Sequence, residues 1–314
     1  MTAAPRLCSM PVLSPAGFVR LAWVEWGPET AGRVVVCVHG LSRNARDFDA
    51  LAQDLAGLGW RVVSVDLPGR GRSEWLRRPE DYAYPFYAAA LAALIGRLGV
   101  DRVDWVGTSM GGLIGMMLAA RPASPIRRLL LNDIGAFIPK ASLERIAQYV
   151  GRDPRFASLA EMEAYLRQVC APFGPLTDAQ WRHLATHSGV QAEGGGWRLH
   201  YDPAIGAAFR SAPPADVDAV RGALEKRGFV ERRGTVDVDP GAGTANVTAD
   251  HQTGFVAKYN SSGAFLWVET FASDTSVNSF SLAVDATGGV YVAGGFRGTT
   301  TFGVGESNPA TLVS

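Results

Sequence analysis

A serine between two glycines, within the stretch VDWVGTSMGGLIGM at residues 103–116, is the feature of this sequence best suited to chemistry. Residues 107–111 (GTSMG) fit the pattern G-x-S-x-G, with a strand-like apolar run before them and a helix-like apolar run after them. In this pattern the serine occupies a tight strand-to-helix turn, and its small neighbours let the strand and the helix approach closely. We therefore predict that Ser109 is a nucleophile.

A serine nucleophile also needs backbone N–H groups that stabilise the oxyanion formed during attack on a carbonyl. The N–H of Met110 begins the predicted helix, and the N–H of Leu41 follows His39 and Gly40 at the end of an earlier strand. We predict these two N–H groups as the oxyanion donors. We place His39 and Gly40 beside the substrate, with His39 as an anchor of the loop and not as the base.

Short β-branched runs alternate with longer amphipathic runs through the first part of the chain, and these elements must position the serine. Near-continuous apolar strands that alternate with helices are typical of a parallel sheet covered on both faces, so the predicted fold class is α/β. The predicted strands lie at residues 33–40, 60–69, 103–109 and 126–133, and the predicted helices at residues 47–59, 84–99 and 110–121.

The pattern changes after Asp133, where residues 138–215 read as a mainly helical insertion. Ser158 with Glu161, and Thr177 with Gln180, have the spacing of capping boxes that begin helices. Such an insertion can form a cap or lid over an active site. The alternative is additional helical packing without a role in the reaction.

The motifs VVVCVHGLSRN, VSVDLPGRGRS, VGTSMGGLIGM and LLLNDIG follow one another in the order found in a known superfamily. Over roughly residues 15–220 the chain resembles the α/β-hydrolases, especially carboxylester and carbon–carbon bond hydrolases with a helical cap. The resemblance implies a parallel sheet, Ser109 as nucleophile and the Met110 and Leu41 N–H groups as oxyanion hole, with no cofactor and no metal. Relatives that cleave haloalkanes or epoxides carry aspartate at this position, so serine argues against those reactions.

The acid and the histidine of that superfamily follow the serine in chain order, the acid after a later strand and the histidine after the last one. Residues 211–228 are not followed by such a strand or by a Gly-His loop, so the last strands of the sheet are predicted to be absent. Asp133, which ends the strand at 126–133, is the candidate acid, and His251 is the candidate base. The strand at 126–133 then becomes an exposed sheet edge.

The last part of the chain, residues 228–314, has a different composition and an imperfect internal repeat. It holds 4 Lys and Arg against 8 Asp and Glu, whereas residues 1–227 hold 26 against 22. The segments FVAKYNSSGAFLW and AVDATGGVYVAGGFRGT resemble bacterial β-propeller repeats of the SBBP kind. About one repeat unit is present, whereas a propeller closes with 4–8 blades, so we predict unpaired edges and self-association.

The predicted domain organisation is a hydrolase core at residues 1–137, a helical cap at 138–215, a junction at 216–227 and the incomplete repeat segment at 228–314. The whole chain of 314 residues has a net charge of zero, which gives no indication of a nucleic-acid partner. Its three cysteines lack metal-ligand or disulfide spacing. Without a signal peptide or an apolar run of membrane-spanning length, we predict a cytoplasmic protein that acts on a small molecule.

The function predicted from these features is hydrolysis of an ester or a related carbonyl compound through an acyl-enzyme on Ser109. Because the usual acid and histidine are missing, two alternatives stay open. One is a non-catalytic hydrolase scaffold whose tail is an interaction module. The other is a chain that joins two unrelated reading frames near residue 227.

Overall fold

The structure is a computed structural model that describes residues 4–134, 140–173 and 176–211, together with eight strands between residues 234 and 313. The chain divides into two compact units, residues 1–229 and residues 230–314. We describe each unit by itself.

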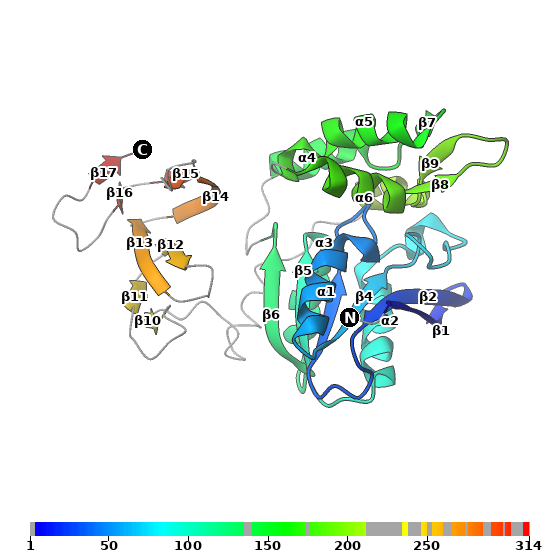
Figure 1. Ribbon diagram of the computed structural model, residues 1–314, viewed down its shortest axis with the longest axis horizontal. Helices are drawn as coiled ribbons and strands as arrows, with labels where there is room; N and C mark the ends of the chain where they lie inside the picture. The colour runs from blue at the N-terminus through cyan, green and yellow to red at the C-terminus, as the bar shows by residue number, and fades with distance from the viewer. Residues whose placement is uncertain are drawn as a thin grey trace. The chain divides into compact units, whose positions relative to one another are not determined.

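A six-stranded mixed sheet in the order β1-β2-β4-β3-β5-β6 forms the centre of the first unit (Figure 1). The four predicted strands, now β3 to β6, are parallel to one another as expected, but β1 and β2 are antiparallel to their neighbours, so the sheet as a whole is mixed. This N-terminal hairpin was not among the predicted strands. The strands are β1 (Arg6–Ser14), β2 (Gly17–Trp26), β3 (Val34–Val38), β4 (Arg61–Asp66), β5 (Val103–Thr108) and β6 (Ile126–Asn132).

Helices cover the sheet because its central strands are apolar on both faces. All five residues of β3 are buried, and successive side chains of a strand point to opposite faces. Val35 and Cys37 pack in one cluster with Phe48 and Ala52, whereas Trp105 of the neighbouring strand packs beneath α3. The helices of the core are α1 (Asp49–Gly57), α2 (Tyr84–Arg97) and α3 (Met110–Ala119), with short 3-10 turns at η1 (Ala45–Phe48) and η2 (Pro79–Asp81).

The strand β6 is the last strand of this sheet, and no strand in the described part of the chain pairs with its outer edge. Only Ile126 of its seven residues is buried, and Leu130 is 57% exposed. An exposed strand edge offers unpaired N–H and C=O groups and apolar side chains to another molecule.

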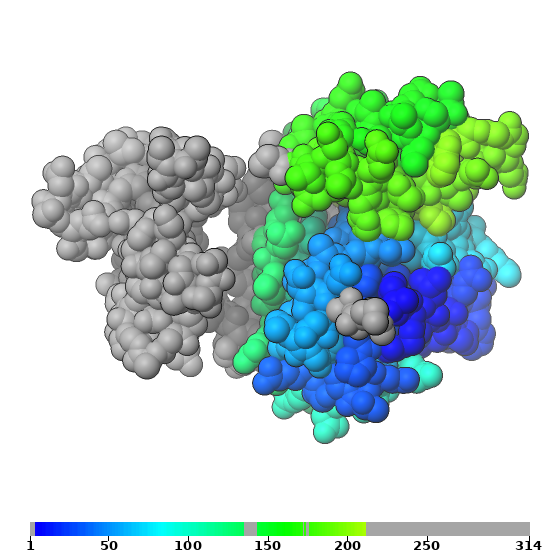
Figure 2. Space-filling model, in the orientation of Figure 1, coloured from blue at the N-terminus to red at the C-terminus, as the bar shows by residue number. Residues whose placement is uncertain are grey.

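The insertion, defined here as residues 140–211, follows β6 and lies over the end of the sheet to which β6 points (Figures 1 and 2). It contains the predicted helices and also a small antiparallel sheet in the order β7-β9-β8, so it is not purely helical. Its elements are α4 (Lys140–Tyr149), β7 (Arg155–Phe156), α5 (Leu159–Val169), η3 (Ala171–Phe173), α6 (Asp178–Ser188), β8 (Gly189–Gln191), β9 (Trp197–Leu199) and α7 (Ala204–Ser211).

The two predicted capping boxes have different outcomes. Thr177 and Gln180 form a complete box, with each side chain bound to the backbone N–H of the other residue. At α5 the Ser158 side chain accepts from the Glu161 N–H, but the Glu161 carboxylate accepts from Ala157 N–H, one residue before the cap. Both helix starts were therefore predicted correctly, although the second box is only half formed.

The turn after β4 joins the core to the insertion through backbone hydrogen bonds. Gly71 N–H donates to the carbonyl of His200 at 3.0 Å, and Asp202 N–H donates to the carbonyl of Gly69 at 2.8 Å. The buried Asp66 carboxylate accepts from two backbone N–H groups, those of Ala45 and Arg72, at 2.7 and 3.0 Å. These hydrogen bonds fix the turn after β4 and hold the core and the insertion together.

The second unit consists of antiparallel strand pairs in its described segments. The predicted turns NSSG and DATG fall between paired strands, outside the described residues. Four pairs are present, with β13 also pairing to β16: β10 (Gly234–Asp237) with β11 (Asn246–Ala249), β12 (Thr253–Tyr259) with β13 (Phe265–Ser273), β14 (Ser276–Val284) with β15 (Val290–Arg297), and β16 (Thr299–Phe302) with β17 (Ala310–Val313).

Among the described helices, none combines the length and the apolar character that crossing a membrane requires.

The exposed edge at β6 leads to a prediction about self-association. We expect Leu130→Lys to shift the full chain toward the monomer, because a charge on this strand opposes pairing with a second molecule. Sedimentation velocity over a range of protein concentrations measures the change. Leu58→Lys is the matched control, since Leu58 is also exposed but ends α1 away from this edge. An equal shift in both variants, or no shift in Leu130→Lys, would contradict the prediction.

Candidate functional site

The backbone of Ser109 is strained, as expected for a serine in the turn between β5 and α3. Its φ is 49° and its ψ is −113°, a conformation that side-chain-bearing residues rarely adopt. Such a residue costs on the order of 1–3 kcal/mol and persists only when its surroundings hold it. Here its N–H donates to the carbonyl of Asn132 at 2.8 Å, and its carbonyl accepts from Gly112 N–H at 2.9 Å.

Two glycines of the motif leave the space that this turn needs. A Cβ on Gly111 would lie 2.1 Å from the Val38 carbonyl oxygen of β3, and a Cβ on Gly107 would lie 2.5 Å from the Gly111 carbonyl. Both obstacles are backbone atoms, which cannot rotate away. The indole of Trp105 adds a hydrogen bond of 3.0 Å to the Gly111 carbonyl. Close packing of β3, β5 and α3 therefore places Ser109.

The loop after β3 lies directly against this serine. A Cβ on Gly40 would be 3.6 Å from the Cβ of Ser109, so the loop passes beside the nucleophile and leaves the space of a methyl group between them. The Met110 N–H is at the first position of α3, where no intrahelical acceptor exists. The two predicted oxyanion donors thus belong to residues on either side of Ser109.

His39 holds the peptide unit that carries the Leu41 N–H. Its Nδ1 lies 2.7 Å from the Gly40 carbonyl oxygen, and its Nε2 accepts from Leu67 N–H at 3.0 Å. With Nε2 accepting, Nδ1 carries the proton and donates to Gly40. The C=O of Gly40 and the N–H of Leu41 belong to one planar trans peptide and point in opposite directions. The hydrogen bond from His39 therefore sets the direction of the Leu41 N–H.

The His39 ring is fully buried and does not line the pocket described below, so its contact with a substrate is indirect. Burial lowers the pKa of His39 to about 3, and the charge of Arg70 acts in the same direction. The ring is therefore neutral at physiological pH.

Arg70 is a positioning residue that the sequence analysis did not single out. It is fully buried, and its guanidinium donates to the carbonyl oxygens of Leu41 at 2.8 Å and Pro68 at 2.9 Å. It also donates to the hydroxyl of Tyr87 and lies 3.9 Å from the sulfur of Met110. In the described part of the chain no carboxylate forms an ion pair with it. The available signal was a charged residue between the two glycines of the PGRG turn.

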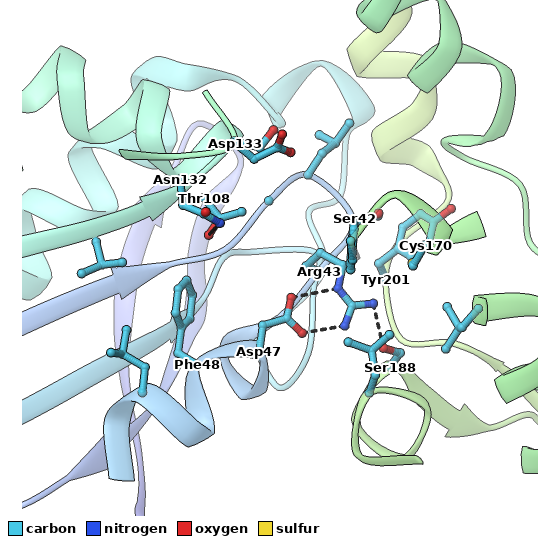
Figure 3. Close-up of a pocket in the computed structure, with 18 of the residues that line it drawn as sticks. Ser42, Arg43, Asp47, Phe48, Thr108, Asn132, Asp133, Cys170, Ser188 and Tyr201 are labelled. Atoms are coloured by element: carbon cyan, nitrogen blue, oxygen red, sulfur yellow. Dashed lines mark hydrogen bonds and ion pairs between the residues drawn. The ribbon is translucent and has the colours of Figure 1, made fainter. Parts of the chain in front are cut away.

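A pocket of about 1170 Å³ begins between the insertion and the end of the sheet, where Ser109 lines it, and continues along the face of the sheet beside α1 as far as Val35, Trp60 and Asp104. Its wall is largely apolar, with Phe48, Leu130 and Val169 among the side chains that line it. In Figure 3, Thr108, Asn132 and Asp133 lie together on one side of this pocket, and Cys170, Ser188 and Tyr201 lie on the other.

Arg43 connects the core wall of the pocket to the wall of the insertion (Figure 3). It forms two hydrogen bonds with Asp47, of 2.8 and 2.5 Å, and one of 2.9 Å with the Ser188 hydroxyl. Asp133, the predicted acid, is exposed, lines the pocket and has a positive φ of 53°. The structure thus brings Asp133, Gly40, Leu41 and Ser109 to one pocket.

The predicted base is not among these residues. The four described histidines, His39, His183, His187 and His200, do not line the pocket. Within the described part of the chain, no side chain forms a hydrogen bond with the Ser109 hydroxyl. His251 lies outside the described residues.

Replacing the elbow glycine tests the close packing. We expect Gly111→Ala to lower the free energy of unfolding by about 2 kcal/mol or more, because the new methyl group meets the Val38 carbonyl. Gly96→Ala is the control, since Gly96 lies in α2 with open space around its missing Cβ. This change should raise stability by about 0.5–1 kcal/mol. Urea unfolding measures both, and a neutral Gly111→Ala would contradict the packing account.

The buried neutral His39 predicts a pH dependence of stability. Below pH 6.5 the unfolded chain takes up a proton on His39, whereas the folded chain does so only near pH 3. The free energy of unfolding should therefore decrease as the pH is lowered through this window. From His39 alone the decrease between pH 7 and pH 5 should be about 2 kcal/mol. Urea unfolding of the natural chain and of His39→Gln should show the steeper fall in the natural chain. Equal slopes would contradict this role.

Comparisons with known proteins agree with this geometry. The family model of the alpha/beta hydrolase fold matches residues 33–181. The chain is 47% identical over 245 residues to the 3-hydroxybutyrate-oligomer hydrolase of Cupriavidus necator, a match that covers 77% of this chain and 83% of that protein. It is 28% identical over 182 residues to an esterase of Mycobacterium tuberculosis, which covers 57% of this chain and 59% of that protein.

A crystal structure of an alpha/beta hydrolase from Novosphingobium aromaticivorans superposes with a TM-score of 0.63. It is 31% identical, and the match covers 71% of this chain and 80% of that one. The α/β-hydrolase fold predicted for the first part of the chain is confirmed by this agreement of family model, relatives and structure. The chain belongs to the α/β-hydrolase family.

Proposed function

We propose that the protein is a serine hydrolase that cleaves a carboxylic ester through an acyl-enzyme on Ser109. The observation that carries this proposal is the strained Ser109 at the wall of a large pocket, which Gly40 and Leu41 of the oxyanion loop also line. Strain of this kind at a pocket supports a functional role for the residue, because strained backbone conformations cluster at active sites and ligand-binding positions.

In the proposed reaction the Ser109 Oγ attacks the carbonyl carbon of the ester, and its proton passes to a base. The negative charge that forms on the carbonyl oxygen is stabilised by the N–H groups of Met110 and Leu41. The C–O bond then breaks, and the alcohol leaves with a proton from the base. Water attacks the acyl-enzyme in the same way and releases the acid, which restores Ser109.

The base and its orienting acid belong to the same proposal. His183, His187, His200 and His251 all follow Ser109 and Asp133, as the usual order of serine, acid and histidine requires. We propose His251 because its distance from Ser109 along the chain is about that expected of the base, whereas the other three belong to the insertion. Asp133 at the pocket is the acid that would orient it. An imidazole that reached Ser109 would complete a catalytic triad.

The proposed substrate class is an ester of a short hydroxy acid, such as an oligomer of 3-hydroxybutyrate. The support is the identity of 47% to a hydrolase of such oligomers, together with an apolar pocket near the serine. Arg43 presents a cation in the same pocket, although Asp47 already pairs with it.

The insertion is proposed as a cap that closes over this substrate, and residues 228–314 as a propeller-like interaction segment. The support for the cap is the pocket wall, which the core and the insertion share. The support for the segment is its antiparallel strand pairs. Domain limits at residues 1–137, 138–215, 216–227 and 228–314 and a cytoplasmic location remain part of this proposal.

A second candidate function is a non-catalytic scaffold that keeps the hydrolase fold. One observation favours it: among the described residues, no histidine lines the pocket of Ser109. Loss of the base typically lowers the rate by several orders of magnitude. Measured turnover therefore separates the two functions.

The hydrolase proposal predicts loss of ester turnover in Ser109→Ala. Hydrolysis of p-nitrophenyl butyrate and of the 3-hydroxybutyrate dimer should fall by at least about a thousandfold in kcat, because the acyl-enzyme of the proposed reaction forms on the Ser109 hydroxyl. Ser9→Ala is the control, since Ser9 is exposed on β1. Activity that survives Ser109→Ala would refute the nucleophile, and absent turnover in the natural chain would favour the scaffold.

A further inference from the structure

Three side chains with metal-binding chemistry meet where α6 of the insertion contacts the core, next to the pocket but not among the residues that line it. They are Asp49 of α1 and His183 and His187 of α6. One ligand atom from each lies within 4.8 Å of the other two. The Nε2 of His183 and the Oδ2 of Asp49 are 3.4 Å apart. The proposed function uses none of these three residues.

Helix geometry brings the two imidazoles together. His183 and His187 are four residues apart, so they lie on the same face of α6 one turn from each other. Their ring centroids are 4.5 Å apart in an edge-on arrangement. Two histidines at this spacing are a common source of two ligands for one metal ion. A carboxylate from a second element supplies the third ligand.

The surrounding contacts hold α6 against the segment before α1. The Asn44 side chain donates to the His187 carbonyl at 2.9 Å, and Arg43 donates to the Ser188 hydroxyl at 2.9 Å. The Nε2 of His183, which faces Asp49, also lies 3.1 Å from the carbonyl oxygen of Arg46, so a metal on this nitrogen would replace that hydrogen bond. The histidines and Asp49 therefore face each other before any metal binds, which reduces the ordering that binding requires.

The distances fit a small transition metal after a modest side-chain movement. Ligand atoms about 2.0–2.1 Å from a tetrahedral zinc ion lie about 3.3 Å from each other. The pair formed by His183 and Asp49 already has this separation, at 3.4 Å. The widest pair must close by no more than about 1.5 Å, which rotation of the His187 ring can supply. Water would occupy the fourth position, as in sites with three protein ligands.

Arg46 is the competing partner that sets the expected affinity. Its Nε lies 2.9 Å from the Oδ1 and 2.7 Å from the Oδ2 of Asp49. A metal on Oδ2 must displace Nε and also Nη2 of Arg46, which lies 2.5 Å from the same oxygen, and it leaves Oδ1 for the guanidinium. Hydrogen-bonded carboxylate ligands are usual in metal sites. The charge of the guanidinium still opposes a nearby cation. We therefore expect a dissociation constant in the micromolar range rather than the nanomolar range.

We propose that Asp49, His183 and His187 bind a divalent transition metal, with zinc as the representative ion, and that the bound metal fastens α6 to α1. Two imidazoles and one carboxylate favour zinc, nickel or copper over magnesium and calcium, which prefer oxygen ligands. The bound metal would also fix the pocket wall. Leu184 and Ser188 follow the two histidines directly, and Phe48 precedes Asp49.

Titration of the full chain, prepared without a histidine tag, with zinc chloride in a calorimeter tests the site. We expect one equivalent to bind with a micromolar dissociation constant, and His183→Ala and His187→Ala to weaken it at least about tenfold each. His200→Gln is the matched control, because this histidine belongs to the insertion but not to the cluster, and it should leave the affinity unchanged. Magnesium chloride should give no binding.

Cobalt(II) provides a second readout that does not depend on activity. The natural chain and His200→Gln should develop visible absorption bands of a cobalt–imidazole complex, and both alanine variants should lose them. Circular dichroism of each variant shows whether it is folded. Zinc affinity that is equal in the natural chain and both folded alanine variants, or no one-to-one binding in the natural chain, would overturn the proposal. Neither readout depends on Ser109. Failure of the metal-site proposal would therefore leave the hydrolase proposal intact.

Discussion

The close approach of three backbone segments, β3, β5 and the start of α3, is the constraint on which the rest of the structure depends. Gly107 and Gly111 permit it, because a side chain at either position would overlap backbone atoms. This packing holds Ser109 in a conformation that an isolated chain would avoid, and the serine therefore ends at the wall of the pocket instead of inside a helix. The stability of the sheet thus maintains the strain that presents the nucleophile.

Buried polar side chains also hold the oxyanion loop at Gly40 and Leu41 in a fixed position beside the serine. His39 orients the peptide between Gly40 and Leu41. Arg70 donates a hydrogen bond to the Leu41 carbonyl and also lies against the sulfur of Met110. These hydrogen bonds lie in an interior of low dielectric, where a satisfied network is rigid and a broken one is costly. Stabilisation of an oxyanion depends on such preorganisation, since donors that are already aligned need no reorganisation during the reaction. The turn around Arg70 also forms backbone hydrogen bonds with the insertion, so the same turn holds the oxyanion loop and the insertion in place.

Features that arise from local sequence patterns could be predicted, whereas features that depend on contacts between distant segments could not. The elbow at Ser109 and the strands β3 to β6 arise from local patterns, which the sequence displays directly. The hairpin of β1 and β2 and the small sheet of the insertion depend on pairing partners, and the sequence analysis missed both. Arg70 and the cluster around Asp49 acquire their roles only through contacts between distant segments. His251 was chosen by chain order, and it stays a prediction.

The central claim is that Ser109 is an accessible nucleophile in a preorganised site. Exposure of the full chain to a fluorophosphonate, followed by intact-mass measurement, tests it most directly because the reagent traps an activated serine without needing the right substrate. The account predicts a single covalent adduct on the natural chain and none on Ser109→Ala. An unmodified natural chain that is demonstrably folded, or an adduct that persists in Ser109→Ala, would contradict it.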